Sequence, residues 1–381
     1  MLNKIISNIK PKSLDNFFSK LNFFKDKHLG KAKHYLFGLM NGFKRFNIET
    51  LSLATADDQY SYRQLYYFID KANWDEDKLN EKRIQFLESD TRTETKKDGC
   101  LSIDDTSVRK NGDKTDGTYY QYCGSEGRMA NCKVVVTSHY SDETKDFPLD
   151  MESYYKDDIS KLDLACLIID KSIERNLSFN YINFDSWYCT KQVIKKVEEH
   201  QKYFISYLKS NRIVRYKNQR VSVSDLVKII SAEYSDESRK LGIDLGKVYV
   251  KSLGEYRLII KDEKCFVTNN FEKEITAGEI IKQYKKRWAI DDFYKKAKDD
   301  LSFGQFQTRK GLSIMRHWTM VFLAHAFYLH CKLKGVFSKI YQESINSLSD
   351  FAKLLQNLNL IRIAKDKTNV LLARLKLNLL N

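Results

Sequence analysis

The chain has 381 residues and a mass of 44.8 kDa, which is too large for one small hydrophobic core and predicts two or three packed units. With 42% hydrophobic residues, 13% aromatic residues and only two prolines, the composition excludes a disordered or collagen-like chain. The net charge of +15 and the sequence pI of about 9.2 predict a polyanionic partner, because basic residues neutralise phosphates and the interspersed aromatic residues can stack on bases.

Neither a membrane segment nor a cysteine-rich metal motif is recognisable in the sequence. The longest apolar run, near residues 320–329, is too short to cross a bilayer, and residues 1–20 lack the cleavage site of a secretory signal. The seven cysteines are scattered without a C-x-x-C pair, which is typical of reduced structural thiols. We therefore expect a cytoplasmic protein without a membrane partner.

Residues 1–90 are predicted to form a basic helical domain that binds DNA. The first fifty residues contain ten Lys and Arg against three Asp and Glu, and Phe and Leu recur there at helical spacing. Trp74 followed by Asp75 is typical of a helix boundary. The polar run at residues 88–99 is typical of a linker.

Residues 98–210 have the pattern of a mixed α/β sheet. Three strand-like segments come first, then a helix, a strand, a second helix and a fifth strand: CLSIDDTSV, NCKVVVTSHY, FPLDMESYY, DDISKLDLACLIIDKSIERN, FNYINFDSWY, TKQVIKKVEEH and QKYFISYLK. The first three strands suggest an antiparallel meander. This order resembles the ribonuclease-H-like fold, so we expect these residues to form the first part of such a domain.

The remaining chain is predicted to interrupt and then complete this domain. Residues 211–272 lose the helical pattern and contain strand-like segments, which predicts a β-rich insertion. Helical periodicity resumes after Thr276, a suitable N-cap, and residues 273–330 are expected to complete the domain. Residues 331–381 are a C-terminal helical region and a candidate for dimerisation.

Carboxylates follow two of the predicted strands. Asp104 and Asp105 end the first strand and Asp185 ends the fourth, and these two strands are neighbours in a sheet of this order. Crowded carboxylates repel one another unless a hard divalent cation such as Mg²⁺ lies between them. An Asp at a strand end is more often a turn or cap residue, so a metal site requires a further carboxylate.

The segment at residues 281–310 is predicted to be a helix that supplies this carboxylate. At about 100° per residue, Tyr284, Arg287, Asp291 and Lys298 share a stripe roughly 60° wide. On its own, the stripe is typical of a solvated face with i,i+4 ion pairs. If Asp291 faces the sheet, it completes a site for two metals, one activating the attacking oxygen and one stabilising the leaving oxygen.

The spacing of these four residues resembles a family signature. Bacterial insertion-sequence transposases of the DDE, hairpin-forming, cut-and-paste class carry Tyr, two residues, Arg, three residues, Glu, six residues and Lys. Tyr284, Arg287, Asp291 and Lys298 reproduce this spacing, with Asp in place of Glu. The similarity covers nearly the whole chain and continues in YLFGLMNGFKRFN, IDDTSVRKNG, QYCGSEGRMANCKVVVTSHY, NFDSWY, RWAIDDFYKKAKDDLSFGQFQTRK and RHWTMVFLAHAF.

The resemblance implies a two-metal site and assigns its ligands. Asp104, Asp185 and Asp291 would hold Mg²⁺, with Mn²⁺ as a substitute, and Asp105 would replace Asp104 if the strand register is shifted by one. Cleavage at the transposon ends, hairpin formation and strand transfer into target DNA would follow. The insertion at 211–272 would contact DNA.

The resemblance also implies partners and phosphate contacts. Arg287 and Lys298 would hold phosphates beside the scissile bond, and Tyr284 would hydrogen-bond a phosphate near the transposon end. The partners would be double-stranded DNA, namely terminal inverted repeats and target DNA, and a second copy of the chain in a homodimer on DNA. Such a protein would be cytoplasmic in a bacterium and nucleoid-associated when bound to DNA.

One departure from the signature leaves alternatives open. Asp291 is one methylene, about 1.5 Å, shorter than Glu, and metal sites respond to displacements of that size. The site either works with three Asp residues, or the chain is a catalytically impaired, transposase-derived DNA-binding protein; a general ribonuclease-H-like nuclease is a third interpretation. Trp288 is expected to be a packing residue, whereas Trp187 is equally consistent with packing and with a place at the site.

Overall fold

The computed structural model describes two compact units. The described residues are 14–40, 60–112, 114–333, 347–353 and 355, so most of the predicted C-terminal region at 331–381 lies outside them. One unit is formed from Met1–Glu94, Gly112–Asp116 and Tyr294–Asn381, and the other from Thr95–Asn111 and Gly117–Phe293. The first boundary, between residues 94 and 95, falls in the polar run at 88–99.

The first unit is helical. Its helices are α2 (Leu14–Leu21), α3 (Asp26–Met40), α5 (Tyr62–Asp70), α6 (Glu76–Glu88), α13 (Gly311–Leu333) and the end of α12 (Trp288–Asp300). Helix α13 is buried along most of its length, with Trp318 fully enclosed, and contacts α2, α3, α5 and α6. No described helix is both long enough and apolar enough to cross a membrane.

The predicted helix boundary at Trp74 and Asp75 is confirmed. Asp75 is the N-cap of α6, and its carboxylate accepts a hydrogen bond from the backbone N–H of Lys78. The Trp74 indole N–H donates to the carbonyl of Phe68 at 2.7 Å, so the end of α5 is tied to the start of α6. Local capping chemistry therefore determines this junction.

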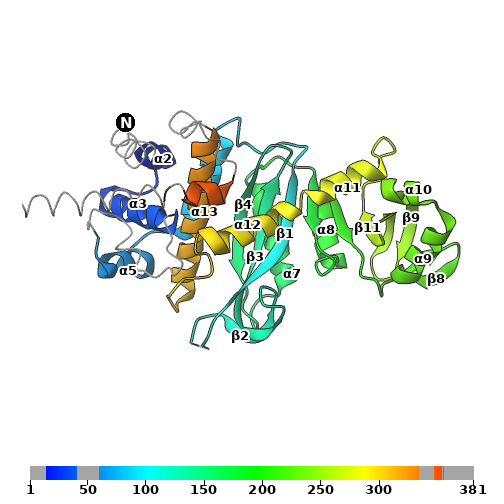
Figure 1. Cartoon of the computed structure of the whole chain (residues 1–381), viewed down its shortest axis with the longest axis horizontal. Helices are drawn as coiled ribbons and strands as arrows, with labels where there is room; N and C mark the ends of the chain where they lie inside the picture. Colours follow the sequence, from blue (N-terminus) through cyan, green and yellow to red (C-terminus); the bar gives the residue numbers. More distant parts are fainter. Residues whose placement is uncertain (1–13, 41–59, 113, 334–346, 354, 356–381) are drawn as a thin grey trace, which may run out of the picture. The chain divides into compact units, whose positions relative to one another are not determined.

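The second unit contains a mixed sheet (Figure 1). Its strands are β1 (Cys100–Arg109), β2 (Thr118–Cys123), β3 (Arg128–Ser141), β4 (Asp146–Ser153), β5 (Tyr181–Phe184), β6 (Tyr203–Tyr207), β7 (Ile213–Tyr216), β8 (Gln219–Ser222), β9 (Ile243–Val250), β10 (Gly254–Lys261) and β11 (Lys264–Thr268). In the described part of the chain the order is β2-β3-β1-β5-β6-β11-β10-β9-β7-β8, and β4 also pairs with β3. Strands β1, β5 and β6 are parallel, whereas β3 is antiparallel to β1 and β4. The predicted meander and the parallel neighbours are confirmed, and β2 is an additional strand.

Helices pack on both faces of this sheet. Helices α7 (Lys161–Glu174) and α8 (Lys191–Glu199) contact β3, β4 and β6, and α11 (Ala277–Lys285) contacts β6. Successive residues of a strand point to opposite faces. Cys100, which contacts Gln283 of α11, therefore shares a face with Asp104, whereas Asp105, which contacts Lys161 of α7, lies on the other.

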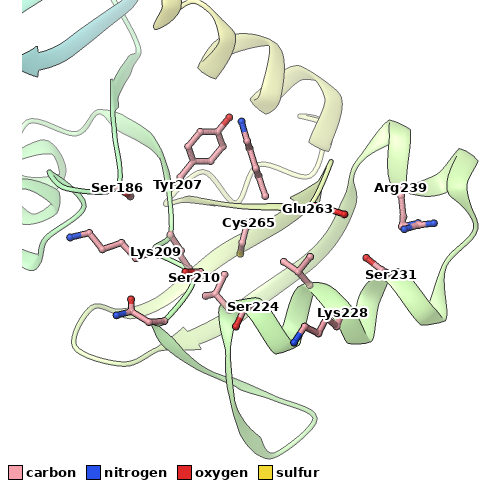
Figure 2. A pocket seen from close by; sticks show the side chains of 15 residues that line it. Ser186, Tyr207, Lys209, Ser210, Ser224, Lys228, Ser231, Arg239, Glu263 and Cys265 are labelled. Atoms are coloured by element: carbon pink, nitrogen blue, oxygen red, sulfur yellow. The ribbon is translucent and has the colours of Figure 1, made fainter. Parts of the chain in front are cut away.

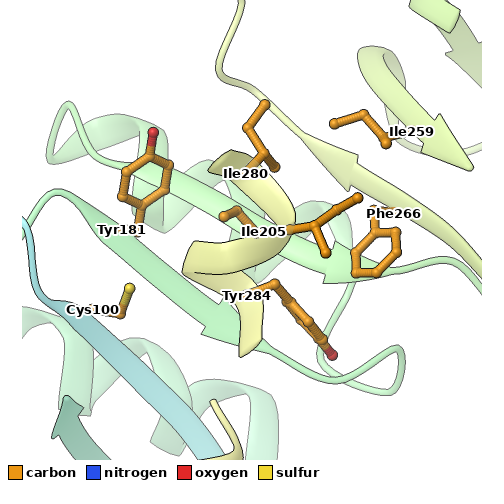
Figure 3. Packing of buried hydrophobic residues seen from close by; sticks show 8 residues of the cluster. Cys100, Tyr181, Ile205, Ile259, Phe266, Ile280 and Tyr284 are labelled. Atoms are coloured by element: carbon orange, nitrogen blue, oxygen red, sulfur yellow. The ribbon is translucent and has the colours of Figure 1, made fainter. Parts of the chain in front are cut away.

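The core between the sheet and α11 is apolar (Figure 3). Ile280, Ile281 and Tyr284 of α11 pack on strand residues that include Ile205 and Phe266. Thr276 caps α11 as predicted, and a capping box with Glu279 satisfies the first N–H groups of the helix. The apolar face of α11 thus holds the helix on the sheet, and the capping box determines where the helix begins.

The insertion at 211–272 differs in part from the prediction. Its strands β9, β10 and β11 match the strand-like segments, and β11 pairs with β6, so the insertion extends the main sheet. Two helices, α9 (Val223–Glu233) and α10 (Asp236–Leu241), were not predicted. Ser222 caps α9 and the following apolar residues recur at helical spacing, which is the local signal for this helix.

Candidate active site

Asp104 lies on β1, and Asp185 directly follows the neighbouring parallel strand β5. The register of β1 and β5 pairs Ile103 with Phe184, so Asp104 and Asp185 are the next residues in that register. Asp104 shares the face of Cys100, on which α11 packs, and the Asp185 charge acts on both Asp104 and Asp291. Asn183, two residues before Asp185, donates a hydrogen bond to the carbonyl of Gln283 of α11 at 2.9 Å. The predicted adjacency of these two strands is confirmed, but the prediction that Asp104 and Asp105 end the first strand was wrong, because pairing with β3 continues β1 to Arg109.

Asp104 carries a destabilised charge. Burial raises the pKa of Asp104 to about 7; the Arg287 guanidinium opposes this rise, and the nearby carboxylates of Asp185, Asp105 and Asp291 reinforce it. Arg287 Nη1 lies 2.7 Å from Asp104 Oδ2, which makes a charge-assisted hydrogen bond. One cation is thus shared among several acids.

Asp185 is held by a turn that follows β5. Its Oδ1 accepts hydrogen bonds from the backbone N–H groups of Trp187 at 2.9 Å and Tyr188 at 3.2 Å. The Ser206 hydroxyl donates to the carbonyl of Asp185 at 3.0 Å. The turn therefore fixes the direction of the carboxylate without help from a ligand.

Asp105 has a separate set of partners on the opposite face of β1. Lys161 Nζ lies 2.9 Å from Asp105 Oδ2, and the Tyr188 hydroxyl donates to Asp105 Oδ1 at 3.0 Å. The Lys161 ammonium also lies 5.5 Å from the centre of the Trp187 ring. Asp105, the sequence-based fallback ligand, thus anchors the turn that carries Asp185.

The predicted continuous helix is interrupted between α11 and α12. Helix α11 ends at Lys285, and α12 runs from Trp288 to Asp300, so residues 301–310 of the predicted helix are not helical. In the turn between them, the N–H groups of Lys286 and Arg287 donate to carbonyls three residues earlier, at 3.2 and 3.0 Å. The Ser141 hydroxyl donates to the Lys286 carbonyl at 3.0 Å, as Asn183 does to that of Gln283, so side chains of the sheet compensate for the helical bonds that are lost.

Because of this turn, the four residues of the predicted stripe lie in different environments. Tyr284 is 1% exposed, and its ring centre lies 4.5 Å from that of Tyr207 and 5.4 Å from that of Phe266. Burial raises the pKa of Tyr284. Lys298 is half-buried on the part of α12 that belongs to the first unit. The phosphate contacts predicted for Tyr284 and Lys298 stay predictions.

Asp291 is the most exposed of the three predicted acids. Its side chain is 46% exposed, and Arg287 Nη2 lies 3.2 Å from its Oδ2. Partial burial raises the pKa of Asp291, Arg287 lowers it, and Asp185 raises it further. Arg287 therefore joins Asp104 to Asp291.

The expectation that Trp288 is a packing residue was wrong. Its side chain is 55% exposed, and the Arg287 guanidinium lies 5.5 Å from the ring centre. Trp187 is also substantially exposed, at 43%. Both indoles are thus at the surface beside residues of the candidate site.

The carboxylates are suitable ligands for a divalent metal ion, but their side chains are not arranged around a common point as in a metal site. The Asp185 carboxylate contributes to the raised pKa values of both Asp104 and Asp291, and oxygen ligands suit Mg²⁺. Within the described ranges, however, no three His, Cys, Asp or Glu side chains are arranged to hold a metal ion. Arg287 provides the positive charge between Asp104 and Asp291 instead.

Four residues that support this site were not predicted as such: Ser141, Lys161, Asn183 and Tyr188. Asn183 and Tyr188 are the first and last residues of the segment NFDSWY. Alternation along a strand places Asn183 on the same face as Asp185, which is a signal that sequence reasoning could have used. Lys161 and Ser141 carry no comparable local signal.

A mixed sheet with paired carboxylates beside a basic helix end defines a candidate site for phosphodiester chemistry, and comparisons with known families agree with this class. Residues 95–327 match the family described as "Transposase DDE domain", and residues 16–165 match "DDE superfamily endonuclease". The first match alone covers more than half of the chain. The chain therefore belongs to the DDE transposase family and is an enzyme of that type.

A relative and a solved structure complete the comparison. The chain is 25% identical over 353 residues to "Probable transposase for insertion sequence element IS701" from Microchaete diplosiphon, covering 85% of this chain and 88% of the relative. A structure of the "Drosophila P element transposase strand transfer complex" matches with 9% identity and a TM-score of 0.18, covering 85% of this chain and 81% of the other. A TM-score this low carries no argument.

Proposed function

We propose that this transposase cuts DNA at the ends of its element by metal-dependent cleavage of phosphodiester bonds, with Asp104, Asp185 and Asp291 as the metal ligands. The observation that carries the proposal is the position of Asp104 on β1 next to Asp185, which directly follows the parallel strand β5. Transposase domains of this superfamily generally use divalent metal ions and act on DNA. The net charge of +15 suits a DNA substrate.

The proposed core of the enzyme is a ribonuclease-H-like sheet. The order β4-β3-β1-β5-β6, with β4, β3 and β1 antiparallel and β1, β5 and β6 parallel, supports this assignment. In such a sheet the first and fourth strands of the fold, here β1 and β5, are neighbours. Two carboxylates far apart in the sequence then act at one place.

In the proposed mechanism, Asp104 and Asp185 present carboxylates from a rigid sheet edge and Asp291 presents a third from α12. When bound, Mg²⁺, or Mn²⁺ in its place, would activate the attacking oxygen and stabilise the leaving oxygen. Arg287 now donates a hydrogen bond to Asp104 and forms an ion pair with Asp291, and its planar fork suits a DNA phosphate equally well. Arg287 thereby keeps the acids in place before DNA arrives and can hold a phosphate afterwards.

Later steps and assembly belong to the same proposal. The 3′ hydroxyl freed by the first cut attacks the opposite strand to form a hairpin, which is reopened before strand transfer into target DNA. Residues 1–90 recognise the terminal inverted repeats, 211–272 contact DNA beside the site, Tyr284 and Lys298 contact phosphates, and two copies of the chain bring two ends together. The protein works in the bacterial cytoplasm, on the nucleoid.

The test uses a labelled duplex that carries the element's end, with Mg²⁺, Mn²⁺ or EDTA. We expect nicking at the end that requires the metal, followed by a hairpin that runs at double length on a denaturing gel. A second duplex with a scrambled terminal repeat separates a transposase from a general nuclease, which would cut both equally. No cleavage with either metal at any protein concentration would contradict the proposal.

A second candidate is an impaired transposase that binds DNA without cutting it. The short acid at position 291 and the absence, among the described residues, of three converging metal-binding side chains favour it. The variant Asp291→Glu extends the carboxylate by one methylene, and Asp292→Glu, on the neighbouring exposed residue, is the matched control. A rise in cleavage of about 100-fold in the first variant alone would identify impairment, whereas a change of less than about twofold would show that the site works with Asp.

A further inference from the structure

An open pocket of about 910 Å³ lies in the insertion, next to the turn that carries Asp185 (Figure 2). It is formed by the segment after β6, by helix α9 and by the turn between β10 and β11. Figure 2 shows Lys209 on one side of the pocket and Lys228 and Arg239 on the other. The volume is within the range of pockets that hold small ligands, roughly 300–1,000 Å³.

The charged residues of the lining are mostly basic. Lys209, Lys228, Arg239 and Lys264 contribute to it, against one acid, Glu263. Asp225 and Asp236 partly neutralise Lys228 and Arg239 respectively. In the described part of the chain, Lys209 and Lys264 form no ion pair, so their charges are available to an anion.

The rest of the lining suits a sugar-phosphate chain. Ser210, Asn211 and Ser224 supply polar groups at the mouth, and Val223, Val227 and Cys265 form an apolar, buried floor. Phosphate oxygens accept hydrogen bonds from side chains of this kind, while sugars and bases can contact the apolar surface. The combination differs from that of a solvated lysine patch, which has no such floor.

The pocket lies next to residues of the candidate active site. Ser186, the residue after Asp185, lines it, and so does Tyr207, whose ring centre lies 4.5 Å from that of Tyr284. The Lys264 ammonium lies 5.0 Å from the centre of the Tyr207 ring, which places that charge over the same aromatic group. A strand bound near Asp185 would therefore lie beside this pocket.

We propose that this pocket binds the phosphate backbone of a DNA strand that leaves the active site, with Lys209 and Lys264 as its main phosphate ligands. The inference rests on the proposed function, since it takes the substrate to be DNA. It adds a binding site for the strand beyond the bond that is cut. Its chemistry is that of a phosphodiester chain, which an unpaired strand or the near strand of a duplex can supply.

The test measures DNA binding without cleavage, in EDTA, at several salt concentrations. The double variant Lys209→Ala, Lys264→Ala is compared with the control Lys156→Ala, Lys195→Ala, which removes two exposed lysines of the same unit that lie outside the pocket and outside residues 211–272. We expect about 10-fold weaker binding for the pocket variant and a salt slope lower by about one to two, since each lost phosphate contact reduces the slope by about one. In the control variant, the change in affinity and the change in salt slope should each be less than half of those in the pocket variant.

Two DNA probes distinguish the source of the phosphates. A loss confined to a single-stranded oligonucleotide assigns the pocket to an unpaired strand, and a loss with an end-containing duplex assigns it to duplex DNA; either supports the proposal. Restored affinity in Lys209→Arg, Lys264→Arg supports a charge effect. Unchanged binding of both probes by the pocket variant, or an equal loss in the control, overturns the proposal. Because binding is measured in EDTA, this result is independent of whether the wild-type protein cleaves DNA.

Discussion

Asp104 and Asp105 are neighbours in sequence and lie on opposite faces of β1, and the charged groups around their carboxylates differ. On the face toward α11, Asp104 is near two other carboxylates and shares Arg287 with Asp291, so its charge is poorly compensated. On the face toward α7, Asp105 has Lys161 and the Tyr188 hydroxyl.

The difference separates a reactive acid from a supporting one. An acid whose charge is satisfied within the fold stabilises the protein, whereas an acid that the fold leaves strained can gain from a ligand. Asp105 also acts on the reactive face indirectly, because Tyr188 belongs to the turn that orients Asp185. The comparison between the two faces can be tested by changing one acid at a time.

The largest expected effect is on cleavage. Asp104→Asn removes a proposed metal ligand at almost constant volume and should lower the rate of end cleavage by at least about 10³-fold. Asp105→Asn keeps an oxygen for the Tyr188 hydroxyl and should lower the rate by less than about 10-fold. Single-turnover nicking of an end-containing duplex measures both, and equal losses would remove the distinction between the faces.

The next effect is on stability and its dependence on pH. The pKa of Asp104 is about 7 in the folded protein, above its ordinary value near 4, so between these values the folded state binds more protons than the unfolded state. The free energy of unfolding therefore falls as pH rises from about 4 to 7. Without divalent metal, Asp104→Asn should be more stable than the wild type above pH 7, by up to about 4 kcal/mol, with no difference near pH 4.

Chemical denaturation at pH 4, 6 and 8 checks this sign. Asp105→Asn is the matched control and should be less stable than the wild type at pH 8, by about 1 kcal/mol, because it loses a partly exposed ion pair with Lys161. An Asp104→Asn variant that is less stable than the wild type at pH 8 would mean that Arg287 compensates Asp104 fully.

A smaller effect is expected from the metal itself. Mg²⁺ at about 100 times its dissociation constant should stabilise the wild type by about 2.7 kcal/mol, since it binds the folded state alone. Thermal unfolding with and without Mg²⁺ measures this, and Asp104→Asn should lose most of the stabilisation while Asp105→Asn keeps it. Equal stabilisation of all three proteins would locate the metal elsewhere.

The smallest effect comes from the link between the two faces. Tyr188→Phe removes only the hydroxyl that Asp105 accepts, which should cost about 1 kcal/mol of stability. Cleavage should fall a few-fold and require more Mg²⁺, because the turn that orients Asp185 is less fixed. Tyr120→Phe, on an exposed tyrosine outside the proposed DNA-binding segments, is the control and should change neither quantity. A stability loss with an unchanged metal requirement would limit Tyr188 to a structural role.

The sequence was sufficient to predict that Asp104 and Asp185 are neighbours. The order of strands and helices predicts that β1 and β5 pair in parallel, and each Asp is recognisable at the end of its apolar run. Alternation along β1 also predicts that Asp104 and Asp105 face opposite ways. Which face carries the site depends on the position of α11, and no local pattern in residues 100–109 specifies that.

The turn between α11 and α12 could not be predicted in the same way. Residues 281–300 contain neither Pro nor Gly, so local propensity favours one helix. The turn is stabilised by Asn183 and Ser141, which are 100 and 145 residues away from their partners in sequence. The missed helix α9 is a different case, since its cap and periodicity were present in the sequence.

The hydrogen bond between the Cys100 thiol and the Gln283 side chain has a consequence for folding during synthesis. These residues are 183 positions apart, and the apolar face of the sheet around Cys100 is covered only when α11 packs on it. Contacts of such sequence separation form late, because a long loop must close first. During synthesis the chain therefore emerges with Asp104 and Asp185 long before Asp291, and it has no complete set of acids until residue 291 has left the ribosome. Nascent and truncated chains that end before α11 should be inactive and prone to aggregation through this uncovered face.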